Sequence, residues 1–145
     1  MGAKENLELI EELRHAAEDQ DFERYGSLLA EDATLRMAGV PGTLGGLMKG
    51  REAIVSFART AATGTGRFEV KEMFADDHHV CVVGKMTSDR FPGNQYLKSA
   101  DRPYSTYQCS IYRIVDGKVA EWTTYVNWLD AYVQTGLVAV SSLTP

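Results

Sequence analysis

The first part of the chain repeats apolar residues at intervals of three and four positions, which is typical of one helix face. The first such group is Leu9, Ile10, Leu13, Ala16 and Ala17, with glutamates on the opposite side. Asp21 is a favoured N-cap residue type and predicts a second helix whose apolar face holds Phe22, Tyr25, Leu28 and Leu29. A short alternating strand is predicted at 33–37, and a third helix presents Ile54, Phe57, Ala58 and Ala61.

After a Thr-Gly repeat at 63–66 the apolar period changes to two, which predicts strands at 68–74, 80–87, 106–115 and 118–127. Asp116-Gly117 is a strong hairpin signal between the last two strands. A short helix at 128–134 and a tail to Pro145 complete the order. Helices followed by a run of strands predict an α+β domain, with the helices covering one face of a curved sheet.

The segment 88–105 shows neither period and contains Pro92, Gly93 and Pro103. Connections of this length are usually either functional or disordered. Two interpretations stay open here, a flexible connector and a lid over an apolar pocket. The apolar side chains available to such a lid are Phe91, Tyr96, Leu97 and Tyr104.

Composition narrows the class of protein further. The chain has 145 residues, 44% of them hydrophobic, which predicts a single domain over 1–145. A net charge of −5 with scattered basic residues argues against nucleic acid as a partner, and no apolar stretch is long enough to predict a membrane span. The acidic start is unlike a signal peptide, and Cys81 and Cys109 stand outside any CxxC, so a cytoplasmic location is expected. The three histidines show no paired acidic–histidine spacing and give no reason to expect a metal or cofactor.

Three segments carry a family resemblance: LLAEDATLRM, KGREAIVSF and the closing hairpin YRIVDGKVAEWTTYVNW. Together they resemble the NTF2-like superfamily and, within it, the SnoaL-like branch of polyketide cyclases, ketosteroid isomerases and limonene-epoxide hydrolases. The resemblance covers nearly the whole chain. It implies a cone, in which a strongly curved, mostly antiparallel sheet wraps around three to four helices and leaves an apolar cavity at the open end. It also implies a homodimer formed through the outer face of the sheet.

Within such a cone, strand alternation selects the residues that face inward, whereas Cys81 and Cys109 point outward. The expected substrate-binding set is Leu13, Leu35, Met37, Ile54, Phe57, Val82, Gly84, Met86, Trp122, Val126 and Trp128. The expected catalytic set consists of neutral hydrogen-bonding groups, namely Gln108, Ser110, Tyr112 and Thr124. Structural alternatives remain open, because Ser110 and Thr124 could satisfy one another and both tryptophans could be core residues.

Positions that resemble the catalytic positions of family enzymes hold residues without a charge. Met37, Leu13 and Ser110 stand where the isomerases have a base, a tyrosine and an oxyanion acid. Met86, Gly84 and Thr124 stand at the Asp-Arg-Asp set of the epoxide hydrolases, and Thr124 also replaces the acid of aldol-type cyclases. All three histidines and the Asp76-Asp77 pair are expected on helix surfaces or in a turn. Acid–base chemistry therefore lacks its usual groups.

An apolar chamber with few polar groups can still promote a reaction by orienting a folded substrate. We therefore expect a polyketide cyclase that closes a carbocycle in an apolar linear substrate, in a [4+2] sense and without a cofactor. Two alternatives stay open. One is an epoxide-opening, isomerising or aldol-type enzyme that uses Tyr112 and a pocket water, and the other is a non-catalytic carrier of a hydrophobic small molecule.

Overall fold

The computed structural model describes residues 2–62, 66–93 and 95–145. Its helices are α1 (Ala3–Glu18), α2 (Phe22–Ser27), α3 (Arg51–Ala62) and α4 (Trp128–Gln134), with short 3₁₀ turns at Gly42–Leu44 and Val140–Ser142. Its strands are β1 (Leu29–Ala38), β2 (Leu47–Lys49), β3 (Arg67–Ala75), β4 (His79–Ser88), β5 (Tyr104–Val115) and β6 (Lys118–Val126). They form one sheet in the order β2-β1-β6-β5-β4-β3. The pair β1–β6 is parallel and every other neighbouring pair is antiparallel.

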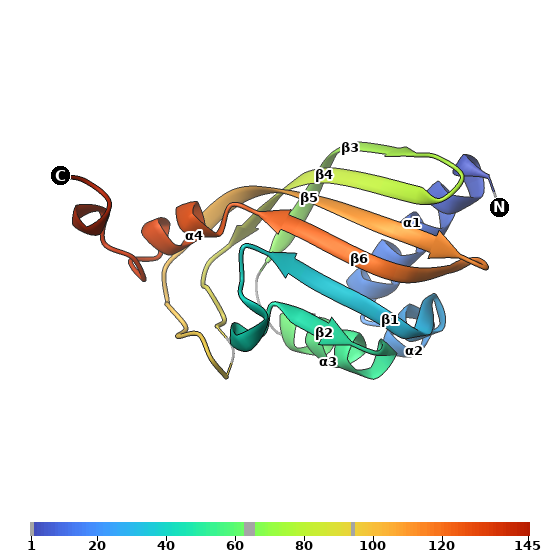
Figure 1. Ribbon diagram of the computed structural model, residues 1–145, viewed down its shortest axis with the longest axis horizontal. Helices are drawn as coiled ribbons and strands as arrows, with labels where there is room; N and C mark the ends of the chain where they lie inside the picture. Colours follow the sequence, from blue (N-terminus) through green and yellow to red (C-terminus); the bar gives the residue numbers. More distant parts are fainter. Residues whose placement is uncertain (1, 63–65, 94) are drawn as a thin grey trace.

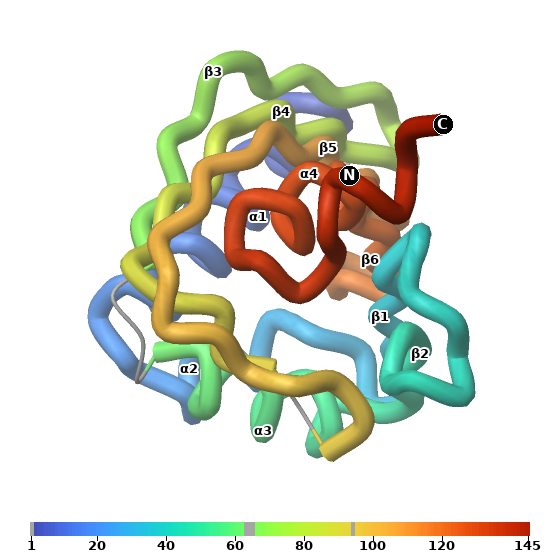
Figure 2. Tube along the Cα trace, turned by 90° about the vertical axis from the view of Figure 1, so that its left-hand side faces the viewer, coloured from blue at the N-terminus to red at the C-terminus, as the bar shows by residue number. Residues whose placement is uncertain are grey.

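The curved sheet covers α1, α2 and α3 on one side, while α4 and the C-terminal tail extend beyond the sheet at the end opposite the N-terminus (Figure 1). Figure 2 looks onto that end, where α4 and the connection between β4 and β5 lie in front of the sheet. Helix α1 packs against β3 and β4, and α3 packs against β1. The expected α+β cone is confirmed: the fold is NTF2-like, with four helices and an unclosed, mixed, six-stranded sheet.

The hydrophobic core lies between the helices and the sheet, towards the narrow end of the cone. Its largest fully buried apolar side chains are Ile10, Leu13, Leu29, Leu35, Ile54, Val80, Val82 and Val119, each at most 2% exposed. They come from two helices and three strands, so the core joins both layers. Burial of each such side chain stabilises the fold by about 1.5–3 kcal/mol.

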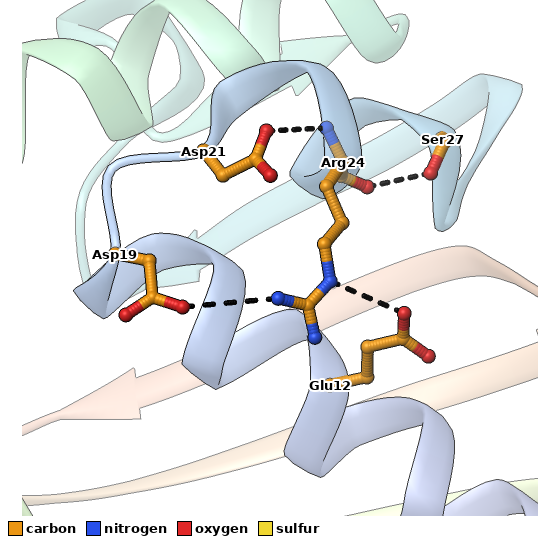
Figure 3. A network of polar contacts seen from close by, with 5 residues as sticks. All are labelled: Glu12, Asp19, Asp21, Arg24 and Ser27. Atoms are coloured by element: carbon orange, nitrogen blue, oxygen red, sulfur yellow. Dashed lines mark hydrogen bonds and ion pairs between the residues drawn. The ribbon is translucent and has the colours of Figure 1, made fainter.

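The helical hairpin is held by a local polar network (Figure 3). The Asp21 side chain caps α2 by accepting a hydrogen bond from the Arg24 backbone N–H at 3.1 Å, as the sequence predicted. The Arg24 guanidinium then reaches back to α1, with Nε 3.2 Å from Glu12 Oε1 and Nη1 3.8 Å from Asp19 Oδ2. This cation therefore bridges the two helices across their short turn.

Two local predictions, for Leu29 and Ala61, were wrong, and one strand was missed. Leu29 does not continue the second helix; it begins β1 and pairs with Val119 of β6 in the parallel ladder, because tertiary strand pairing overrides the local helical spacing. The missed strand is β2, which lies in the glycine-rich segment 39–50, and its three residues are too few to be recognised by alternation. Ala61, expected inside the cone, is exposed.

Candidate functional site

Strand register brings the predicted inward residues together in rows across the sheet. Met37, Thr124, Ser110 and Val82 are successive partners on β1, β6, β5 and β4. A second row joins Leu35, Trp122, Tyr112 and Val80, and a third joins Val126, Gln108 and Gly84. Residues opposite one another share a sheet face, so these rows form the helix-covered face that alternation predicted.

Exposure divides this face into a packed half and an accessible half. Four of the expected substrate-binding residues, Leu13, Leu35, Ile54 and Val82, are at most 2% exposed and belong to the core. The partly exposed residues are Met37, Phe57, Met86, Gln108, Trp122, Val126 and Trp128. Most of these lie towards the wide end of the cone, beside α4. A ligand that enters without disturbing the core therefore meets this second set.

Gly84 has a packing role that the sequence did not reveal. A Cβ at this position would lie 2.3 Å from Cζ of Phe68 and 2.6 Å from the Glu69 carbonyl oxygen. The missing side chain thus leaves room for the Phe68 ring from the neighbouring strand. Gly84 positions an aromatic wall of the cone, and Phe68 is an additional lining residue.

The buried polar groups form a neutral cluster. Ser110 Oγ donates a hydrogen bond to Thr124 Oγ1 at 3.1 Å, so these two hydroxyls satisfy one another. Tyr112 is 5% exposed and stacks on Trp122 with ring centroids 5.0 Å apart. Burial raises the pKa of Tyr112 well above its ordinary value, although a hydrogen bond with Ser110 and the nearby Arg14 charge lower it in part. Burial, with Tyr112 close by, likewise raises the pKa of Tyr25. Both phenols therefore stay protonated at neutral pH.

Arg14 is a cation that sequence reasoning did not place near the site. It follows Leu13 on α1, its side chain is 24% exposed, and its Nη2 lies 3.6 Å from Glu18 Oε1. Its charge acts on the Tyr112 hydroxyl. The helical pattern did not predict this position of Arg14, because a long arginine side chain can start on the polar face of a helix and still reach the edge of the protein interior.

Carboxylates and imidazoles lie outside the cone interior. All 20 aspartates and glutamates and all three histidines are exposed. Asp76 shows the turn role that was expected, since its Oδ1 accepts hydrogen bonds from the backbone N–H groups of His78 and His79 at 2.7 and 2.6 Å. These bonds lower the pKa of Asp76. In the described ranges, no three His, Cys, Asp or Glu side chains cluster as a metal site.

The two arms of the connection between β4 and β5 are joined to each other by backbone hydrogen bonds. The backbones of Phe91 and Ala100 exchange two hydrogen bonds of 2.9 and 3.0 Å. The Phe91 ring is 5% exposed and packs edge-on against Tyr104, Trp128 and Tyr132. Tyr96, in contrast, is 54% exposed. The predicted lid residues thus separate into an aromatic anchor beside α4 and an exposed tip.

Two clefts of the described surface lie outside the cone. A cleft of about 780 Å³ at the narrow end is lined by Asn6, His78, His79, Arg113 and their neighbours. A smaller one of about 330 Å³ lies beside α2, at Asp21, Glu23, Arg24 and Ser27. Neither cleft is lined by a predicted site residue. The candidate site therefore consists of the inward-facing residues at the wide end of the cone.

The outer sheet face carries exposed apolar side chains among charged ones such as Lys85, Arg113 and Glu121. Phe74, Tyr107, Ile111, Val115 and Tyr125 are 39–62% exposed. Cys81 and Cys109 lie on this face, as expected, with their Sγ atoms 3.4 Å apart. Burial and the hydrogen bond to Cys109 raise the pKa of Cys81 to about 11. The Cys81 thiol is therefore a poor nucleophile at neutral pH.

Comparison with known proteins agrees with this geometry. The SnoaL-like domain model matches residues 10–122, and the chain therefore belongs to the SnoaL-like family. A proposed SnoaL-like polyketide cyclase from Jannaschia sp. CCS1 superposes with a TM-score of 0.78 at 13% identity, covering 94% of each chain. An NTF2-like protein from Burkholderia xenovorans LB400 gives 0.75 at 22% identity, covering 93% of this chain and 98% of its own.

An LEH-like epoxide hydrolase from M. tuberculosis superposes with a TM-score of 0.70 at 16% identity, covering 98% of each chain. At these identities the structures share the fold alone. The curated proteins contain no match. Among the described helices, none combines the length and apolarity needed to cross a bilayer.

Gly84→Ala tests the contact between Gly84 and Phe68. Because the new methyl group would displace the Phe68 ring or shift the β3 backbone, we expect the free energy of unfolding to fall by about 1–3 kcal/mol, measured by urea denaturation. Gly42→Ala is the matched control, since a Cβ there meets nothing within 4 Å. Equal stability of the two variants would contradict the packing role.

Proposed function

We propose that this member of the SnoaL-like family is a polyketide cyclase. It binds an apolar linear polyketide in the wide half of the cone and closes a carbocycle by intramolecular [4+2] cycloaddition. In length and in its long connection at 88–105 the chain resembles the indane-forming cyclase of indanomycin biosynthesis. The observation that carries the proposal is the exposure of every carboxylate and every imidazole.

A cycloaddition suits this interior because it needs no proton transfer. The enzyme has to fold the chain so that the reacting carbons approach within contact distance, and orientation of this kind can lower a barrier by several kcal/mol. A hydrogen bond to a conjugated carbonyl adds polarisation of the acceptor double bond. Gln108 is the best placed donor: its side chain faces inward and is partly exposed, and its amide takes part in no hydrogen bond of the described chain.

The proposal also covers the lid, the oligomeric state, the location and a second candidate function. The connection at 88–105 acts as a lid whose aromatic anchor lies against α4. Two copies pair through the outer sheet face, where burial of the exposed Phe74, Tyr107 and Tyr125 would drive association. The protein works in the cytoplasm. A non-catalytic carrier is the second candidate, because the same lack of charged interior groups also suits binding alone.

Turnover should be almost independent of pH from roughly pH 6 to 9, because no interior group changes protonation there. The raised pKa values of Tyr25 and Tyr112 move their titration further above neutrality. The measurement is the product distribution from a linear polyene bearing a conjugated carbonyl, compared with buffer across this range. A steep or bell-shaped profile would instead indicate an acid–base enzyme.

If the product distribution with enzyme equals that in buffer, the cyclase proposal fails. Mass spectrometry of the small molecule released on denaturation then decides whether the protein is a carrier. A ligand that copurifies and is recovered unchanged supports that second candidate.

Gln108→Leu should lower turnover about three- to tenfold, as expected for loss of one hydrogen bond to substrate. The thermal midpoint should change little, because Gln108 makes no hydrogen bond within the described chain. Tyr125→Phe is the control. Tyr125 lies on β6 and faces the outer side of the sheet, so this change should leave turnover unchanged. A large loss of stability with normal turnover would make Gln108 a structural residue.

Deletion of residues 95–98 tests the lid. The thermal midpoint should remain almost unchanged, because the deletion spares the Phe91–Ala100 backbone pair and the buried Phe91 ring. Turnover and ligand affinity should both fall, measured by product formation and by calorimetry. Unchanged turnover and affinity would identify the segment as a simple connector.

A further inference from the structure

Two fully buried hydrogen-bond donors inside the cone have no acceptor among the described residues. The indole nitrogens Nε1 of Trp122 and Trp128 are both covered from solvent, and neither has a hydrogen-bond partner among the described residues. These are the chain's two tryptophans. Since an indole can only donate, each N–H needs an acceptor, and a buried donor left unpaired destabilises the free protein.

The surroundings of Trp122 place its donor beside the polar cluster. Trp122 faces inward opposite Leu35 and Tyr112, and its ring stacks on Tyr112. The Ser110 hydroxyl donates its only proton to Thr124, so it has no proton left to donate to a ligand. The positive charge of Arg14 acts on the same region through Tyr112. This end of the site thus offers an unpaired N–H beside hydroxyl groups, and it complements an oxygen atom that can accept a hydrogen bond.

The surroundings of Trp128 are aromatic. Its ring stacks on Tyr132 with centroids 6.1 Å apart, and the Phe91 ring contacts it edge-on. On its other side a Cβ at Gly39 would lie 3.0 Å from Trp128 Cδ1. From Trp122 to Val126 the strand advances about 13 Å, so the two tryptophans mark the inner and outer ends of the accessible half.

We propose that Trp122 Nε1 holds the carbonyl oxygen of the ligand, with the hydrocarbon chain directed towards the aromatic cluster around Trp128. The ligand class is therefore a linear, apolar chain with a conjugated ketone, ester or thioester at its inner end. This inference rests on the proposed function for the location of the site. It adds the direction of binding and a specific donor.

The test compares a probe that has a carbonyl acceptor with a shorter hydrocarbon probe that has none, and it reads the change that each variant causes for each probe. Pseudoionone is a linear trienone, and alloocimene is a linear conjugated triene hydrocarbon. Trp122→Phe keeps an aromatic ring against Tyr112 but removes the N–H. It should weaken pseudoionone binding about three- to tenfold and leave alloocimene binding unchanged, measured by calorimetry. Trp128→Phe is the matched control and should keep the preference for pseudoionone.

Proton–nitrogen NMR of the unaltered protein gives a second measurement that does not depend on the folding of a variant. The two indole N–H signals are assigned from the two Phe variants or, failing that, from contacts to neighbouring rings. Pseudoionone should move the Trp122 signal downfield and alloocimene should not. An unmoved signal at saturation, equal effects of both probes, or binding of neither probe would overturn the inference.

These results are separate from those that test catalysis. Discrimination between the probes without turnover of any polyene would leave the carbonyl site standing and identify the protein as a carrier. Turnover that is unaffected by Trp122→Phe, with no shift of the indole signal, would leave the cyclase standing and remove the carbonyl site.

Discussion

The register between β5 and β6 is the constraint on which the interior of this protein depends. The Asp116-Gly117 turn starts this hairpin, with φ values of 49° and 72° at the two residues, the left-handed pair that a two-residue hairpin requires. Beyond the turn the pairing shifts by one residue between Arg113 and Ile114, and only after this shift does the ladder place Tyr112 opposite Trp122 and Ser110 opposite Thr124. Without the shift the other face of β6 would turn inward, with Tyr125 in the cone.

The inward residues form an interior with hydrogen-bonding capacity but without carboxylates or imidazoles. Hydroxyls, one amide and two indoles supply the polarity, and the tyrosines are held in their protonated form by burial. Such a surface can bind and orient a neutral, largely apolar molecule at little desolvation cost. It has no strong base, so reactions that begin with proton abstraction are poorly served.

The wide end owes its shape to segments outside the sheet. The Gln134 side chain of α4 both donates to and accepts from the Ser105 backbone at 2.9 and 2.8 Å, which ties the helix to the start of β5. The Phe91 ring then joins the β4–β5 connection to the same helix. This end of the molecule therefore carries a small aromatic unit built from three separate stretches of chain.

Much of this could be predicted from local pattern, because helix and strand periodicities are properties of neighbouring residues. The hairpin, the Asp21 cap, the inward parity of Ser110, Tyr112 and Thr124 and the outward cysteines all follow from spacing and residue type. The tertiary structure alone decided how far the core fills the cone, so that Leu13, Leu35, Ile54 and Val82 are packed away from any ligand. It also placed the Phe68 ring over Gly84, Arg14 beside Tyr112 and two unpaired indoles inside. These contacts join residues that are distant in sequence, and helix or strand periodicity contains no information about which distant residues meet.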